Sequence, residues 1–123
     1  MVTATPIPEP IPQGDWIELD DISLEFINNT IAANSKYLNQ TISIRGEISK
    51  IDYKRATSFG LNFYAHDIPT VELVDSGRNR LWCGLDSVDK VGNLSVGGTV
   101  IVNGTIIAWD YNLLYVLPCS IVD

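Results

Sequence analysis

The last third of the chain consists of two apolar runs with a short polar break between them. Residues 94–109 and 113–122 are rich in Val, Ile and Leu, and they are separated at Asp110-Tyr111-Asn112. Two such runs joined by a polar turn predict a β-hairpin. Gly104 lies inside the first run, where a strand bends or lets another backbone come close. This pattern favours the coiled strands of a small barrel.

Residues 41–52 alternate between apolar and polar side chains, as a half-buried strand does. Three isoleucines of this segment are expected to face inward: Ile42, Ile44 and Ile48. The phase of the pattern then slips so that Ile51 faces inward as well. Such a slip predicts a β-bulge between Gly46 and Lys50.

The middle of the chain predicts three further strands. Residues 59–65 form one alternating run, and residues 71–74 and 79–85 form two more. The last two flank Asp75-Ser76-Gly77, which is a typical hairpin turn.

Residues 20–34 predict one amphipathic helix, with Asp20 or Asp21 as its N-cap. Its apolar positions recur at helical spacing: Ile22, Phe26, Ile27, Ile31 and Ala33. This apolar stripe is expected to cover one open end of the barrel.

The strands and the helix together predict an all-β domain with one N-terminal helix. Five to six strands without an internal repeat fit an OB-like closed barrel better than a two-sheet sandwich. Residues 1–18 predict a Pro-rich, acidic spacer, because four of the six prolines alternate through positions 6–12. Residues 19–123 are then the barrel domain with its capping helix, and 123 residues suffice for one such domain.

The net charge of −7 is concentrated near the N-terminus. Six of the fifteen acids lie in the first 25 residues, and the remainder of the chain has nine acids and eight bases. An acidic total argues against general nucleic-acid affinity, since phosphate neutralisation supplies most of such binding. A local basic patch is still compatible with this balance.

Several short motifs recur here in a recognisable order. They include Ile44-Arg45-Gly46, then Leu94 with Gly97-Gly98, then Gly104, and finally Cys119-Ser120-Ile121. Over residues 22–122 this succession resembles the tRNA-anti-like OB-fold family. The resemblance implies an OB fold and no catalytic residues. Many members of the family are envelope lipoproteins, and the family implies nucleic-acid binding only by analogy of fold.

Cys83 and Cys119 lie on strands predicted to be central, and both are expected to point into the core. One interpretation is two buried, inert thiols. The other is a disulfide that fastens the last strand to the third, as expected in an oxidising compartment. The family pattern places cysteines at both positions.

Few residues of the sequence suggest catalysis or metal binding. The single histidine, His66, is expected in an exposed loop, with no second His or Cys close by in sequence to form a metal site. No nucleophile turn and no phosphate-binding glycine loop is recognisable. No apolar run approaches the length of a membrane-spanning helix. We therefore expect no enzyme, no cofactor and no transmembrane segment.

The residues with binding potential are basic and aromatic, and they are expected at the usual ligand face of an OB barrel. Eight of them form the candidate site: Lys54, Arg55, Tyr64, Arg78, Arg80, Trp82, Trp109 and Tyr111. Flat rings stack on bases or sugars, and cations follow phosphates. The alternative is the ordinary exterior of a strand, with Asp75 and Asp110 nearby.

Three functions remain open, and the third of them is the binding of a carbohydrate or other small ligand. The favoured hypothesis is a non-enzymatic binding module, the extracytoplasmic part of a lipid-anchored protein, whose signal or anchor lies outside this chain and whose partner is another envelope protein. It rests on the spacer, the acidic balance and the cysteine pair. The alternative is a single-strand nucleic-acid-binding protein that uses the basic and aromatic face.

Overall fold

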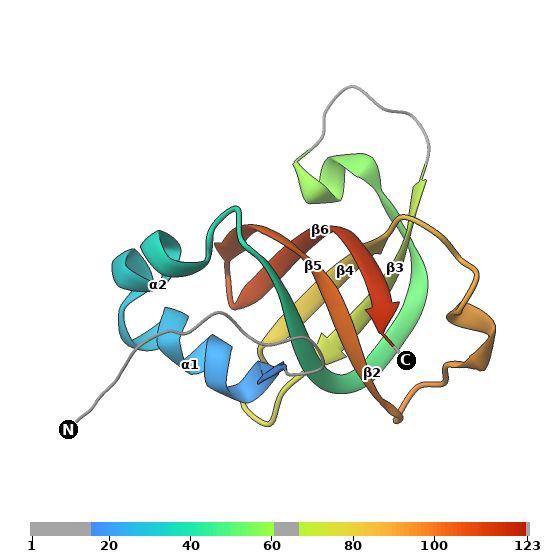
Figure 1. Ribbon diagram of the computed structural model, residues 1–123, viewed down its shortest axis with the longest axis horizontal. Coiled ribbons are helices and arrows are strands. Elements are labelled where there is room, and N and C mark those ends of the chain that lie inside the picture. Colours follow the sequence, from blue (N-terminus) through green and yellow to red (C-terminus); the bar gives the residue numbers. More distant parts are fainter. Residues whose placement is uncertain (1–15, 61–66, 123) are drawn as a thin grey trace.

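The strands of the molecule form a hydrogen-bonded ring (Figure 1). The structure, a computed structural model, describes residues 16–60 and 67–122. Its strands are β1 (Ile17–Glu18), β2 (Thr41–Arg55), β3 (Asp67–Val74), β4 (Arg80–Leu85), β5 (Thr99–Asp110) and β6 (Leu113–Val122). Their order is β1-β2-β3-β4-β6-β5, and β5 returns to pair with β2. This confirms the predicted OB-fold-like β-barrel.

The long strand β2 belongs to both sides of the ring. Residues 41–47 pair with β5, and residues 47–55 pair with β3. The register shifts between Ile48 and Lys50, where the sequence predicts a bulge. A bulge bends a strand and increases its twist, which lets one strand change neighbours.

Both predicted hairpins are present. In the turn between β3 and β4, the Asp75 carboxylate accepts hydrogen bonds from the backbone N–H groups of Gly77 and Asn79, at 2.9 and 2.8 Å. The turn between β5 and β6 consists of Tyr111 and Asn112, whose φ angles are 51° and 60°. Two positive φ angles are typical of the two-residue turn that matches the twist of paired strands.

The barrel interior is aliphatic. Its buried strand residues include Ile44, Ile48, Val71, Leu73, Leu81, Val102, Ile106, Leu114 and Val116. At Gly104, a Cβ atom would lie 2.5 Å from the Pro118 carbonyl oxygen. Of the two alternatives expected at this glycine, a bend or the close approach of another backbone, the structure shows the close approach, between β5 and β6.

The prediction of one helix over residues 20–34 is wrong, because the chain forms two. The first is α1 (Leu19–Asn28) and the second is α2 (Thr30–Tyr37). They are separated by Asn29, at φ −157°, whose side-chain oxygen accepts a hydrogen bond from the Ala32 backbone N–H at 3.1 Å. Asparagine is a preferred N-cap, and this local bond competes with helix continuation.

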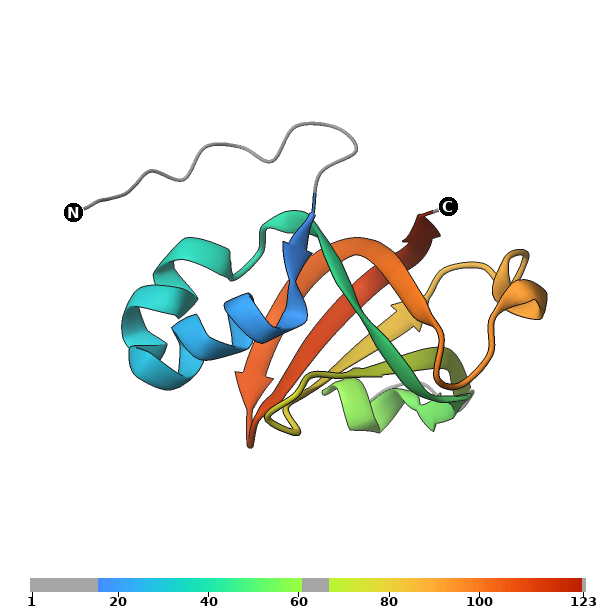
Figure 2. The ribbon, with the colours of Figure 1, turned by 90° about the horizontal axis from the view of Figure 1, so that it is seen from below.

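The break at Asn29 also changes which helical side chains are buried. Ile22 and Phe26 lie fully in the core, whereas Ile27 and Ile31 are 51% and 83% exposed. The expectation that all five apolar positions form one buried stripe is therefore wrong for Ile27 and Ile31, whereas Ala33 is buried as expected. The predicted capping residues are wrong as well, since Glu18 occupies the N-cap position of α1. Figures 1 and 2 both show the helices together at one end of the barrel.

Two short 3₁₀ helices lie in the connections: η1 (Ala56–Phe59) and η2 (Val91–Asn93). The strand predicted over residues 59–65 is wrong at its first residue, because Phe59 belongs to η1. The remainder of that segment, residues 61–66 with Tyr64 and His66, lies outside the described residues.

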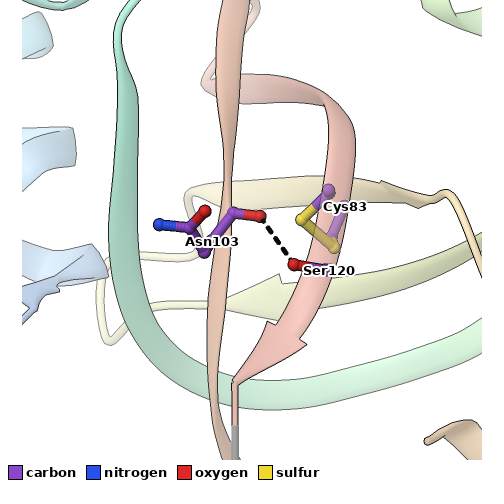
Figure 3. Close-up of a disulfide and its surroundings, with 4 residues drawn as sticks. Cys83, Asn103 and Ser120 are labelled. Atoms are coloured by element: carbon purple, nitrogen blue, oxygen red, sulfur yellow. Dashed lines mark hydrogen bonds between the residues drawn. A yellow bond between two sulfur atoms is a disulfide. The ribbon is translucent and has the colours of Figure 1, made fainter. Parts of the chain in front are cut away.

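A disulfide joins Cys83 on β4 to Cys119 on β6, with the Cα atoms 5.4 Å apart (Figure 3). Both residues are buried. Close to this bond, the Ser120 hydroxyl donates to the Asn103 carbonyl oxygen at 3.4 Å, which adds a contact between β6 and β5. The disulfide therefore fastens a parallel strand pair that is distant in sequence.

Candidate ligand-binding face

Three aromatic rings cover the outer surface of β4 and β6. Trp82 and Tyr115 are partners across these parallel strands, and their rings meet edge-on at a centroid distance of 5.6 Å. Phe59 approaches from η1 and lies 5.9 Å from the Trp82 ring and 6.2 Å from the Tyr115 ring. We call these three residues the aromatic cluster. Because Phe59 is only 4% exposed, it forms the base of the cluster, while the other two rings are half-buried.

Gly84 makes room for this arrangement. A Cβ atom at Gly84 would lie 2.6 Å from Leu117 Cδ1, 3.2 Å from Phe59 Cζ and 3.3 Å from Ile68 Cγ2. The missing side chain thus lets Phe59 and two aliphatic neighbours close over the strand. As a result, η1 is held against the outer surface of the barrel.

A carboxylate holds Trp82 from the neighbouring strand. Glu72 on β3 accepts a hydrogen bond from Trp82 Nε1 at 2.8 Å and another from the Ser49 hydroxyl at 2.7 Å. Burial by itself would raise the pKa of Glu72, but these two hydrogen bonds, with the charges of Arg80 and Lys54, bring the pKa below its ordinary value of 4.5. The group is therefore an anion that fixes the orientation of the indole.

Two cations border the aromatic cluster. The Lys54 ammonium lies 4.5 Å from the centroid of the Trp82 ring, which is a cation–π contact. Arg80 Nη1 lies 4.0 Å from Glu72 Oε1. Rings and cations thus lie within one surface that β2, β3, β4 and β6 share.

The region around this surface is richer in bases than the chain as a whole. Five of the eight Lys and Arg residues fall in residues 50–55 and 67–80, namely Lys50, Lys54, Arg55, Arg78 and Arg80. The same ranges contain four acids, namely Asp52, Asp67, Glu72 and Asp75. With Asp110, which acts electrostatically on Tyr115 of the same face, the region has as many acids as bases, although the whole chain carries −7.

Of the eight predicted site residues, Lys54, Arg80 and Trp82 come together as just described. Tyr111 is 91% exposed in the β5–β6 turn. A hydrogen bond of 3.0 Å from the Arg80 N–H to the Asn112 carbonyl places this turn beside the start of β4. Tyr111 therefore lies at the border of the same face.

The other predicted residues are placed differently. Arg55 ends β2 and is exposed, and Arg78 is exposed in the β3–β4 turn at φ 69°. Trp109 stacks on Phe26 with the ring centroids 5.0 Å apart, so it belongs to the contact between barrel and helix α1. Tyr64 lies outside the described residues.

Besides Phe59, two residues of this face are absent from the predicted set of eight. Tyr115 alternates with the buried Leu114 and Val116, so its outward direction could have been found from the pattern of β6. Glu72 alternates with the buried Val71 and Leu73 in the same way. The predicted hairpin around Asp75-Ser76-Gly77 makes Glu72 and Trp82 cross-strand partners, so their proximity could have been found from the sequence, although the hydrogen bond between them could not.

Neither a metal centre nor a membrane helix is found in the part of the chain that the structure describes. Residues 16–60 and 67–122 contain no cluster of three or more His, Cys, Asp or Glu that could hold a metal ion. Within the same ranges, neither helix has the length and apolar character needed to cross a bilayer.

Comparison with solved structures supports the fold. The chain is similar to the crystal structure of a candidate nucleic acid-binding lipoprotein from Klebsiella pneumoniae, with a TM-score of 0.69 and 20% identity over 89% of this chain and 92% of that one. Yeast Stn1 and Ten1 give a TM-score of 0.44 and 15% identity over 90% of this chain and 65% of that one, a likeness too weak to carry an argument. No family model and no curated protein sequence matches the chain.

Ring topology and structural similarity together define the class of this molecule as an OB-fold-like β-barrel protein. At 20% identity the similarity extends to the fold alone. The more particular resemblance to the tRNA-anti-like family remains a prediction, because no family model matches.

Proposed function

We propose that this protein is a non-catalytic OB-fold module that binds single-stranded nucleic acid on the face around Trp82. The observation that carries the proposal is the aromatic cluster with Lys54 and Arg80 at its border, between η1 and the β5–β6 turn. Stacking on exposed rings with cations along the backbone is the general means of binding single strands. The name of the Klebsiella pneumoniae structure is consistent with this proposal.

The arrangement of charges limits the expected affinity. Glu72 is ionised within the face, and the chain carries −7 overall, so we expect few phosphate contacts and a modest salt dependence. Lys54 covers one side of the Trp82 ring, so a stacking base competes with this contact. Tyr111 offers a ring that is almost fully exposed.

The experiment that tests the proposal is a fluorescence-anisotropy titration of labelled single-stranded DNA and RNA at about 50 and about 200 mM salt. With two to three phosphate contacts, affinity is expected to fall about tenfold between these conditions. The double variant Lys54→Gln/Arg80→Gln should weaken binding and lower the salt slope by about 1 to 2.

A matched control changes the same amount of charge elsewhere. Lys36→Gln/Lys90→Gln removes two cations that lie outside the face, on α2 and before η2. This variant should bind like the wild type. An equal loss of affinity in both double variants would show that only the net charge of the protein matters. Absence of binding at about 50 mM salt would refute the proposal.

A protein partner in the cell envelope is the second candidate function. It is favoured by three exposed aliphatic side chains of the helical end, namely Leu24, Ile27 and Ile31, because exposed apolar groups that lie near one another often mark protein contacts. The buried disulfide is consistent with an extracytoplasmic location.

The two parts of this second proposal are tested separately. Cross-linking in intact envelope fractions should yield an adduct with the wild type and none with Leu24→Ser/Ile27→Ser/Ile31→Ser. Fractionation of source cells and metabolic labelling with palmitate would test location and lipid anchor. Recovery of the protein in the cytosol without a palmitate label would contradict both the extracytoplasmic location and the lipid anchor.

A further inference from the structure

A hollow lies on the outside of the barrel, at residues that the aromatic cluster does not include. It has a volume of about 470 Å³ and is formed by the loop around η2, the start of β5 and the end of β6. Figures 1 and 2 both show this loop beside the C-terminal end of β6. A hydrogen bond of 3.4 Å from the Lys90 ammonium to the Ile121 carbonyl fastens the loop there. We call this hollow the β5–β6 groove.

The groove presents a neutral, aliphatic surface. Its two bases already have partners: Arg45 is paired with Glu18 and lies against the Trp16 ring, and Lys90 is engaged at the Ile121 carbonyl. The aliphatic part of the lining consists of Leu94, Val100, Ile101, Ile121 and Val122. The occupant that fits this surface is therefore held by apolar contacts and not by a charge.

The backbone of β5 is fully paired where it borders the groove. Ile101 has Val122 of β6 as its register partner on one side and Arg45 of β2 on the other. A strand with neighbours on both edges has no row of free N–H and C=O groups for a further chain. An occupant that crosses β5 is therefore bound through side chains, which suits a segment with few N–H groups of its own.

The described chain begins next to this groove. Glu18, Arg45, Ile101 and Val122 are successive register partners across β1, β2, β5 and β6, so they form one row. Trp16 lies over Arg45, which lines the groove, with the guanidinium carbon 5.5 Å from the ring centroid. Because neighbouring strands are about 4.8 Å apart, β1 lies about 10 Å from β5 and about 14 Å from β6.

The sequence that precedes Trp16 matches the groove in composition and in length. Residues 6–12 are Pro-Ile-Pro-Glu-Pro-Ile-Pro, with Glu9 as their single charge. The four prolines have no N–H group to donate, and the two isoleucines supply aliphatic side chains. A proline-rich segment also loses little conformational entropy on binding. The ten residues from 6 to 16 reach up to about 33 Å when extended, which is about twice the distance from β1 to β6.

We propose that residues 6–12 bind in the β5–β6 groove of their own molecule. Ile7 and Ile11 contact the aliphatic surface of Leu94, Ile101 and Val122. Gly14 permits the turn that carries the chain from β1 across β2. This contact is separate from the face around Trp82 and does not depend on nucleic-acid binding there.

The test is paramagnetic relaxation enhancement in the full-length, ¹⁵N-labelled chain. A nitroxide is attached at Thr5→Cys without reductant, since the two native cysteines are bonded to each other. The amide signals of residues 94–101 and 121–122 are expected to lose most of their intensity. The signals of Trp82 and of α2, which lie outside the groove, should keep theirs. Loss centred on Trp82 or α2, or no loss at all, would overturn the site.

Two matched variants test the aliphatic contact. Ile7→Ser/Ile11→Ser should restore the intensity of the groove signals, because it removes the apolar side chains that bind there. Val2→Ser/Ala4→Ser makes the same kind of change outside residues 6–12 and should leave the loss as it is. A loss that persists in Ile7→Ser/Ile11→Ser would overturn the proposed contact.

A mixed sample distinguishes binding within one molecule from binding between two copies. Nitroxide-labelled protein without ¹⁵N is added to ¹⁵N-labelled protein without a nitroxide. The groove signals should keep their intensity in this mixture. Their loss would identify a second copy as the source of the segment and overturn binding within one molecule.

Discussion

Gly104 lies where β5 comes closest to β6. A Cβ atom there would be 2.5 Å from the Pro118 carbonyl oxygen and 2.9 Å from Cys119 Cα, and backbone atoms cannot rotate away as a side chain does. We expect Gly104→Ala to lower the free energy of unfolding by about 2 to 3 kcal/mol, as overpacking does. Urea denaturation measures this. At Gly92 a Cβ would meet nothing within 4 Å, so Gly92→Ala should change stability by less than about 0.5 kcal/mol.

Glu72 should make stability depend on pH in the acidic range. Its pKa in the folded protein lies below the ordinary value of 4.5, so the stabilisation is fully present above that pH and is lost as the pH falls through the folded value. Glu72→Gln should therefore be less stable than the wild type at neutral pH, and this difference should shrink below about pH 4.5. Urea denaturation of both proteins at several pH values gives the comparison. A difference that stays constant with pH would contradict the role given to the carboxylate.

At the scale of single elements, the β5–β6 turn has an unfavourable residue. Tyr111 has φ 51°, in the left-handed region, and its side chain is 91% exposed. Asparagine tolerates this region better, so Tyr111→Asn should raise the free energy of unfolding by about 0.5 to 1 kcal/mol. If the ring binds nucleic acid, the same variant should bind oligonucleotides more weakly. A stable variant with unchanged binding would exclude Tyr111 from the face.

The elements differed in how well the sequence predicted them. The two hairpins and the bulge after Ile48 follow from alternation and turn residues, which are local properties of the chain. The helix break at Asn29 does not follow from the pattern, because the apolar spacing continues through it while the capping bond to Ala32 ends the first helix.

The candidate face was predicted only in part, for a similar reason. Arg80 and Trp82 lie on a predicted strand whose outward side can be read from alternation. Lys54 lies beyond the predicted strand end at residue 52, because β2 extends to Arg55. Trp109 stands at the end of a strand with register shifts, and its stacking on Phe26 depends on where α1 lies in space. Contacts between distant segments of this kind carry no local signal.

At the scale of the whole molecule, the disulfide is the largest single constraint. It links residues 36 positions apart, and the chain-entropy model gives a contribution of about 4 kcal/mol for such a loop. Cys83→Ala/Cys119→Ala should therefore unfold at a distinctly lower urea concentration than the oxidised wild type. Reductant should lower the midpoint of the wild type and have no effect on the double variant. An unchanged midpoint of the reduced wild type would contradict this.

The same covalent link limits how far the molecule can be stretched. The residues between Cys83 and Cys119 include all of β5 and its turn with β6, and the bond bypasses them when the two ends of the chain are pulled apart. About 120 Å of extended backbone thus stays unavailable to an applied force while the bond is intact. In an oxidising environment the domain would act as a short tether, and in a reducing one as a longer, more compliant one.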